Sequence, residues 1–255
     1  TNDAVTSYTF SQNSATPTLT FAGNIASAGT TINLVKSGAG TVILSNTNNT
    51  YGGAGSTNRI DNGLLRVTAD GCLGNAANVV SLNANDAGLR ADGTFTSARR
   101  IDTSAAGGVI DVTIGNALTL TTTALNNGAA NANSFKKTGV GILNLNVNNT
   151  ANYTGVINVN AGAIRISNAG ALGASANETV VAGGASAQFD SVTLSELFSI
   201  NGAGSAGVGA LQAVTGACAL NGNITMQSDS AIGADAGCAL TVGGAIGGGF
   251  NLAKA

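Results

Sequence analysis

The chain has 255 residues, of which 37 are glycine and one is proline, and it contains neither histidine nor tryptophan. Only 9% of the residues are charged, against about 25% in an average soluble domain, and the formal net charge is -2. Without histidine there is no Ser-His-Asp or Cys-His relay and no histidine-ligated metal, so we expect no catalysis, no cofactor and no metal. The slightly negative charge argues against nucleic acid as a partner.

The predicted secondary structure is a series of short strands. Runs of β-branched and apolar residues alternate with Gly-Gly, Asn-Gly, Asn-Asn and Asp-Gly pairs, which are typical of tight corners. Frequent glycine and asparagine argue against helices. In chain order, the predicted strands are Thr41–Ser45, Leu64–Thr68, Val109–Ile114, Leu118–Thr122, Ile142–Val147, Val156–Val159, Ile164–Ser167 and Val192–Leu194.

No run of 18 apolar residues exists, so we expect no transmembrane segment in this chain. Low charge and high glycine also occur in disordered chains, but those are depleted in valine, isoleucine and leucine, which this chain is not. The aliphatic, ring-poor composition favours a folded chain with a thin core.

One block of the sequence occurs twice, with an offset of 99 to 102 residues. KSGAGTVILS at 36–45 returns as KTGVGILNLN at 137–146, and NGLLRV at 62–67 returns as AGAIRI at 161–166. The blocks cover about 32–74 and 133–173, and a third copy begins at 250 and is truncated. The residues that define the repeat are Lys36, Gly38, Gly40, Tyr51, Gly63, Arg66, Lys137, Gly139, Gly141, Tyr153, Gly162 and Arg165.

Evenly spaced short strands with internal repeats predict a parallel β-solenoid. A strand-turn unit of about 20 to 25 residues is the size of one coil, so the chain predicts roughly 11 or 12 coils. We expect one continuous β-helical segment over 1–255, with a narrow aliphatic core and asparagines stacked in ladders at equivalent corners.

The segment 36–73 and its copy 137–172 resemble the passenger-associated repeat of bacterial autotransporters. That pattern runs Lys-[Ser/Thr]-Gly-x-Gly, then Asn-x-Thr-Tyr-Thr-Gly, then Ala-Gly-Thr-Leu-Arg-Val and Ala-Leu-Gly, and the second copy keeps it nearly unaltered. The first copy departs from it with Gly52-Gly53 in place of Thr-Gly. The resemblance implies a right-handed parallel β-helix exported across the outer membrane to the bacterial cell surface or secreted. The translocator barrel of such proteins is expected outside these residues.

The resemblance further implies a structural or adhesive role in cell attachment, autoaggregation or biofilm formation. Its partners would be host-cell or neighbouring-cell surface molecules, or copies of the chain itself. An alternative is a self-assembling filament or matrix subunit that stacks end to end, because neither chain end has the sequence of a cap.

Three cysteines are unusual for passengers. Cys218 and Cys238 lie in matching Cys-Ala-Leu contexts 20 residues apart, about one coil, which makes them a candidate disulfide. The alternative is two stacked, reduced and buried thiols. Cys72 is then expected as a buried free thiol.

Charged residues gather between positions 86 and 111, and they suggest a minor alternative, a polysaccharide lyase or hydrolase. Clustered carboxylates with basic partners can act as acid and base on a glycan. The favoured interpretation is a solvated coil face with local ion pairs. The cluster consists of Asp86, Arg90, Asp92, Arg99, Arg100, Asp102 and Asp111.

Overall fold

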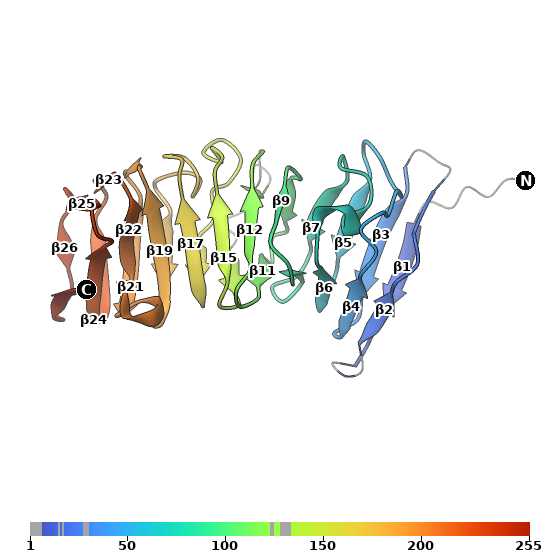
Figure 1. Cartoon of the computed structure of the whole chain (residues 1–255), viewed down its shortest axis with the longest axis horizontal. Helices are drawn as coiled ribbons and strands as arrows, with labels where there is room; N and C mark the ends of the chain where they lie inside the picture. The colour runs from blue at the N-terminus through green and yellow to red at the C-terminus, as the bar shows by residue number, and fades with distance from the viewer. Residues whose placement is uncertain (1–6, 15, 17, 28–30, 123–124, 128–133) are drawn as a thin grey trace, which may run out of the picture.

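The computed structural model is a rod in which strands are stacked along the long axis, with the first described strand, β1 (Ser7–Ser11), and the C-terminus at opposite ends of the rod (Figure 1). The structure describes residues 7–14, 16, 18–27, 31–122, 125–127 and 134–255. Named strands pair in parallel with strands of the coils before and after them, which makes a β-solenoid of about 10 turns. The predicted all-β solenoid is confirmed, with slightly fewer turns than expected.

The strands fall into four stacks, here called sheets 1 to 4. Sheet 1 contains β1 (Ser7–Ser11), β3 (Asn33–Ser37), β5 (Thr57–Ile60), β7 (Val79–Leu82), β10 (Ile101–Thr103) and β13 (Leu125–Asn126). Sheet 2 contains β2 (Leu19–Phe21), β4 (Thr41–Leu44), β6 (Leu64–Val67), β8 (Gly88–Ala91), β11 (Gly108–Val112), β14 (Phe135–Thr138), β16 (Ile157–Val159), β18 (Glu178–Val181), β21 (Leu197–Gly202), the first part of β24 (Ile224–Ala234) and β26 (Ile246–Gly247).

Sheet 3 contains β9 (Phe95–Ser97), β12 (Ala117–Leu120), β15 (Ile142–Leu145), β17 (Gly162–Ile166), β19 (Ala185–Asp190), β22 (Leu211–Thr215), the last part of β24 and β27 (Leu252–Lys254). Sheet 4 contains β20 (Thr193–Leu194), β23 (Ala217–Leu220) and β25 (Ala239–Val242). Among the described residues, two short 3-10 helices interrupt the strands, η1 (Asp70–Leu73) and η2 (Ser205–Gly207).

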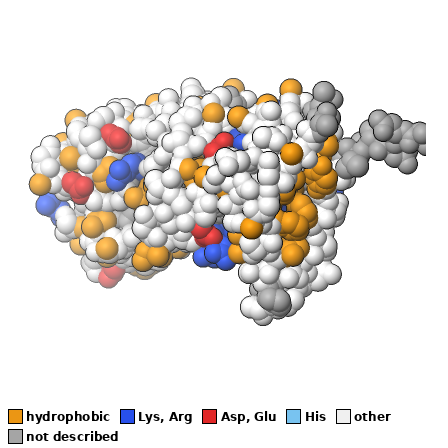
Figure 2. Space-filling model, turned by 45° about the vertical axis from the view of Figure 1, so that its right-hand side comes forward, with side chains coloured by type: hydrophobic (Ala, Val, Ile, Leu, Met, Phe, Trp, Pro, Cys, Tyr) orange, Lys and Arg blue, Asp and Glu red, His pale blue; other side chains and the backbone are white. Residues whose placement is uncertain are grey.

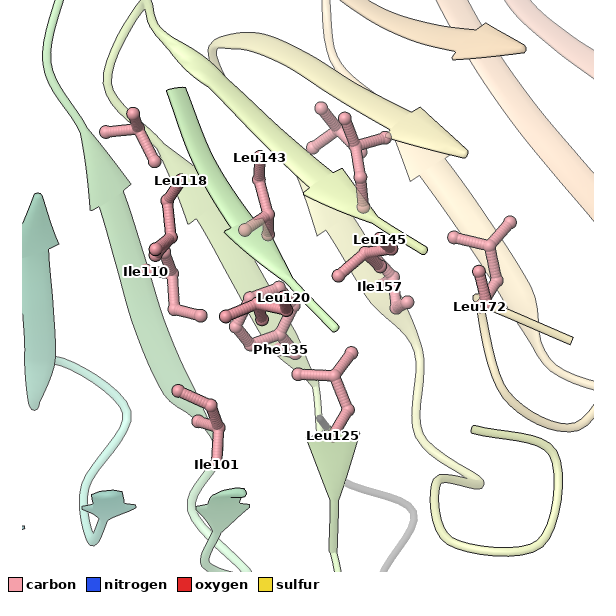
Figure 3. Packing of buried hydrophobic residues seen from close by; sticks show 14 of the residues in the cluster. Ile101, Ile110, Leu118, Leu120, Leu125, Phe135, Leu143, Leu145, Ile157 and Leu172 are labelled. Atoms are coloured by element: carbon pink, nitrogen blue, oxygen red, sulfur yellow. The ribbon is translucent and has the colours of Figure 1, made fainter. Parts of the chain in front are cut away.

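The core is a set of aliphatic ladders that run along the rod. In sheet 3, Leu118 pairs with Leu143, which pairs with Ile164 in the next coil, and all three are fully buried. Alternate residues on each strand point inward, so every coil contributes a few side chains to one continuous core. Figure 3 shows such residues pointing into the interior, with Phe135 as a ring among leucines and isoleucines. The expected narrow aliphatic core is present.

The two copies of the repeat occupy different faces of the rod. Followed in register along sheet 1, Val35 leads through Arg59, Ser81 and Asp102 to Asn126, four coils later. Asn126 is ten residues short of Lys136, the counterpart of Val35 in the second copy. The first copy therefore alternates between sheets 1 and 2 (β3 to β6), whereas the second alternates between sheets 2 and 3 (β14 to β17). The second copy is displaced by one face around the axis.

Candidate functional site

Each repeat copy buries one lysine in the solenoid interior. Lys36 on β3 and Lys137 on β14 are both fully buried. In register, Lys137 lies between Ile110 and Val159, within a ladder of inward-facing aliphatic residues. A charged group at such a place is costly unless hydrogen bonds compensate it.

Three backbone carbonyls hold the ammonium group of each lysine. Lys137 Nζ donates to the carbonyl oxygens of Thr138 and Gly139, both at 2.7 Å, and of Ala161 at 3.1 Å. The first two belong to the corner that follows the lysine, and the third belongs to the next coil. The first copy repeats this arrangement, with Lys36 Nζ donating to the carbonyls of Ser37, Gly38 and Asn62 at 2.9, 2.7 and 2.9 Å. The repeat lysine thus ties consecutive coils together.

Burial lowers the pKa of both lysines. The pKa of Lys137 falls to about 8, and the nearby Asp111 carboxylate partly opposes the change. The pKa of Lys36 is lowered for the same reason. Three carbonyl acceptors need the three donors of an ammonium group, so the hydrogen bonds favour the charged form.

The glycines of the repeat allow one corner to lie directly on the next. Gly162 has a φ of +65°, and a Cβ there would overlap with backbone atoms of Gly139 and Gly141 in the coil below. Ala163 N donates to the Gly141 carbonyl at 3.2 Å, which confirms the close stacking. The corner of the first copy is built in the same way, from Gly38, Gly40 and Gly63.

The repeat tyrosines are interior residues. Tyr51 and Tyr153 are fully buried, and burial raises the pKa of both phenols. The Tyr51 hydroxyl donates to Asn58 Oδ1 at 2.5 Å, and the Tyr153 hydroxyl donates to the Val156 carbonyl at 3.1 Å. Their role is to fill the core beside the loops.

A buried asparagine in each copy bridges three coils. Asn149 Oδ1 accepts from Leu125 N of the preceding coil at 3.1 Å, and its Nδ2 donates to the Ala171 carbonyl of the following coil at 2.7 Å. Asn49 makes the equivalent bonds to Ile25 N and the Cys72 carbonyl, both at 2.8 Å. These asparagines bond to the backbone, whereas the sequence suggested stacks of asparagine side chains.

The repeat arginines lie on outer faces with different neighbours. Arg66 Nη2 is 2.6 Å from Asp92 Oδ2, whereas Arg165 donates to the neutral Gln188 Oε1 at 3.2 and 3.3 Å. From Gln188 the hydrogen bonds continue to Gln212 at 3.0 Å. Gln212 Nε2 in turn donates to Asp235 Oδ1 at 2.6 Å, so the same repeat position is an ion pair in one copy and the start of a hydrogen-bonded ladder that reaches a carboxylate in the other.

The predicted charge cluster divides into four separate groups. Arg90 contacts Asp92 at 2.9 Å and Asp111 at 3.4 Å, next to Arg66. The other three groups are the pairs Arg99 with Asp70, Arg100 with Asp102, and Asp86 with Lys136. Figure 2 shows charged side chains as small, scattered groups on a mostly uncharged surface. The arrangement is that of local ion pairs, as the favoured interpretation predicted.

Sequence reasoning missed that Arg99 is buried. Its side chain is 1% exposed, and Nε is 2.9 Å from Asp70 Oδ1. The same guanidinium donates to the carbonyls of Gly74 and Asn78, at 2.8 and 3.2 Å. Arg99 thus anchors η1 and the loop after it to the next coil. Spacing could have revealed this, because Arg99 lies two residues before the inward-facing Ile101.

Another buried ionisable residue, Glu196, also lies two residues before a buried strand residue, but it precedes sheet 2 whereas Arg99 precedes sheet 1. Arg99 lies two residues before Ile101, which pairs with Val80, and Glu196 lies two residues before Phe198, which pairs with Thr179. The Thr179 hydroxyl donates to Glu196 Oε1 at 3.2 Å. Burial raises the pKa of Glu196 to about 8.

The predicted stacking of Cys218 on Cys238 is wrong. The register places Cys218 opposite Leu240, two residues beyond Cys238, because this coil has 22 residues rather than the 20 that separate the cysteines. Both are free thiols, with Cys218 buried and Cys238 partly exposed. Cys72 is a buried free thiol on η1.

In the described parts of the chain, no group of three or more cysteine, aspartate or glutamate side chains is placed to hold a metal ion. No helix in those parts is long and apolar enough to span a bilayer.

The stacked coils and lysine-tied corners define a repeat-containing β-solenoid. The family model of the passenger-associated-transport-repeat matches residues 34–67 and 135–166, the two segments that bury Lys36 and Lys137. No curated protein and no solved structure matches the chain significantly. The resemblance is confirmed: the chain carries two passenger repeats on a β-solenoid, as an autotransporter passenger does.

Proposed function

We propose that the chain is a rod segment of an exported surface protein and that it mediates adhesion, autoaggregation or biofilm formation. The observation that carries the proposal is the pair of passenger repeats built into a continuous stack of coils. Passenger repeats imply export to the cell surface or the extracellular space. A stiff rod gives reach and many weakly binding sites, a role that needs no catalytic group.

Adhesion can be tested with the purified chain coupled to beads. We expect coated beads to attach to cultured host cells or to each other more than albumin-coated beads do. The control variant lacks residues 37–137, which fuses Lys36 to Thr138 and removes one repeat period of 101 residues. It should form a rod shorter by about 20 Å, because four coils at about 4.8 Å are lost, and it should attach less. Attachment no better than that of albumin beads would refute the proposal.

The charged groups permit a direct test of the alternative that the chain degrades polysaccharides. Asp92 contacts two arginines and Asp102 contacts Arg100, so neither carboxylate is set apart as an acid or a base. We expect no glycan turnover that is lost in Asp92→Asn or Asp102→Asn. Turnover that depends on either residue would establish an enzyme.

End-to-end assembly is a second candidate function, favoured by the last coil. The strands β25, β26 and β27 each pair with one neighbour only, and a cavity of about 600 Å³ opens beside them, lined by residues such as Leu240, Val242 and Leu252. A second copy or a further coil of the same protein would cover these groups. Electron microscopy of the purified chain tests this: fibres support assembly, whereas single short rods contradict it.

A further inference from the structure

The outer face of sheet 1 carries a groove near the N-terminal end of the rod. Its volume is about 410 Å³, within the usual range for ligand pockets. It crosses three adjacent strands, so its lining side chains are outward-facing residues of successive coils. They include Ser7 and Thr9 on β1, Asn33 and Ser37 on β3, Arg59 on β5 and Asp61 directly after it.

Several polar groups in the groove are unused by the fold. The hydroxyls of Ser7, Thr9 and Ser37 have no hydrogen-bond partner among the described residues. Asn33 Oδ1 accepts from the backbone N and the hydroxyl of Thr57, at 2.8 and 3.1 Å. The groove therefore presents free hydroxyls beside a fixed amide.

An exposed ion pair forms one wall of the groove. Arg59 Nη2 is 2.8 Å from Asp61 Oδ2, and the side chains are 49% and 31% exposed. Asp61 Oδ1 accepts from Asn83 Nδ2 at 2.9 Å, which fixes the carboxylate. The pair has no net charge, yet it offers guanidinium donors and carboxylate acceptors side by side.

We propose that this groove binds a neutral, polyhydroxylated chain, that is, an oligosaccharide. Free hydroxyls of two adjacent strands, β1 and β3, lie beside the guanidinium and carboxylate of the ion pair, so the groove offers both donors and acceptors to a ligand rich in hydroxyl groups. Val35 is the one aliphatic residue among the described residues of the lining, whereas a protein partner normally needs large apolar anchors. The absence of net charge in the lining argues against an acidic polymer.

This inference rests on the proposed adhesive function and deepens it by naming a ligand class.

The same sheet provides a matched control pair outside the groove. Arg100 and Asp102 repeat the spacing of Arg59 and Asp61, with Nε 2.7 Å from Oδ1 and side chains 49% and 28% exposed. Asn126 Nδ2 donates to Asp102 Oδ1 at 2.9 Å, as Asn83 does to Asp61.

Binding can be measured by saturation-transfer NMR with neutral hexasaccharides of glucose, mannose and galactose. We expect saturable binding of at least one of them by the unaltered chain. Arg59→Ala should weaken it about tenfold, because a charge-assisted hydrogen bond is lost, and Thr9→Val about threefold. Arg100→Ala should bind like the unaltered chain. Circular dichroism and thermal melting verify that each variant is folded.

Three results would overturn the proposal: no binding of any hexasaccharide, equal binding by Arg59→Ala, or an equal loss in Arg100→Ala. Tighter binding of a sulfated polymer than of every neutral sugar would also overturn it. If the hexasaccharides fail to bind while coated beads still attach to cells, adhesion stands and the groove is not its site.

Discussion

Replacing Lys137 by methionine tests whether the buried lysine holds the coils together. Methionine keeps the length and most of the apolar surface of the side chain but removes the ammonium group. The carbonyls of Thr138, Gly139 and Ala161 then lose their shared donor in the interior. The neighbouring Lys136, whose Nζ lies 3.7 Å from the exposed Asp86, provides the matched control.

The change in the free energy of unfolding expected for Lys137→Met follows from two opposing effects. Three partly buried acceptors left without a donor cost together about 5 kcal/mol, at roughly 1–3 kcal/mol each. Removing a buried charge returns about 3 kcal/mol, because the lowered pKa of Lys137, about 8, reflects a desolvation penalty of that order. We therefore expect Lys137→Met to lower the free energy of unfolding by about 2 kcal/mol and Lys136→Met by less than about 0.5 kcal/mol.

Thermal unfolding followed by circular dichroism should show a Tm lower by roughly 4–8 °C for Lys137→Met. Hydrogen exchange should accelerate at the stacked corner, where Gly141 N donates to the Val112 carbonyl and Ala163 N to the Gly141 carbonyl. If both lysine variants have the same stability and exchange, the ammonium group does not join the coils and the reasoning fails.

Three further predictions concern other buried features. In urea unfolding, Arg99→Met should lower the free energy of unfolding by about 3 kcal/mol and Arg100→Met by under about 0.5 kcal/mol. Of the two arginines, only Arg99 is buried and hydrogen-bonded to backbone carbonyls. Equal effects of the two substitutions would contradict this reasoning. Glu196 has a folded pKa of about 8, above its ordinary 4.5, so its contribution to the free energy of unfolding, up to about 5 kcal/mol, is complete below pH 4.5 and is lost as the pH rises through 8. Stability curves from pH 4 to 9 should lose that slope in Glu196→Gln, and an unchanged slope would rule it out. Gly162→Ala should destabilise the chain by more than about 2 kcal/mol and Gly184→Ala by about 1 kcal/mol, since both have positive φ but only Gly162 touches the coil below; matching melting temperatures would show that stacking is not the cause.

The strands that could be predicted have apolar residues at their inward positions, such as Thr41–Leu44 and Ile142–Leu145, and a polar outward residue such as Asn144 did not obscure them. Strands with a polar or charged inward residue escaped prediction. Thr57–Ile60 contains a buried asparagine and an exposed arginine, and Phe135–Thr138 contains two lysines. Backbone pairing to the coils above and below stabilises such segments whatever their own propensity.

The repeated sequence showed that the segments are related, but it could not show which residues pair between neighbouring coils. Coil length varies: Val67 pairs with Ala91 and Leu220 with Val242, which are 24 and 22 residues apart. A match at 20 residues therefore failed to place Cys218 on Cys238. The buried side of Lys36 was open to prediction, because Leu34 faces the core and alternate residues share a face. The hydrogen-bond partners of its ammonium group could not be predicted, since the third carbonyl, that of Asn62, comes from another coil.

The displacement of the second repeat by one face has a consequence for how such a rod meets its surroundings. A repeat period of whole coils would place every copy of a surface feature along a single edge, and the rod would have one working side. Because the period is four coils and one further face, the second copy is rotated by one face about the rod axis relative to the first. A partner can therefore reach an equivalent corner of the repeat from two different sides of the rod.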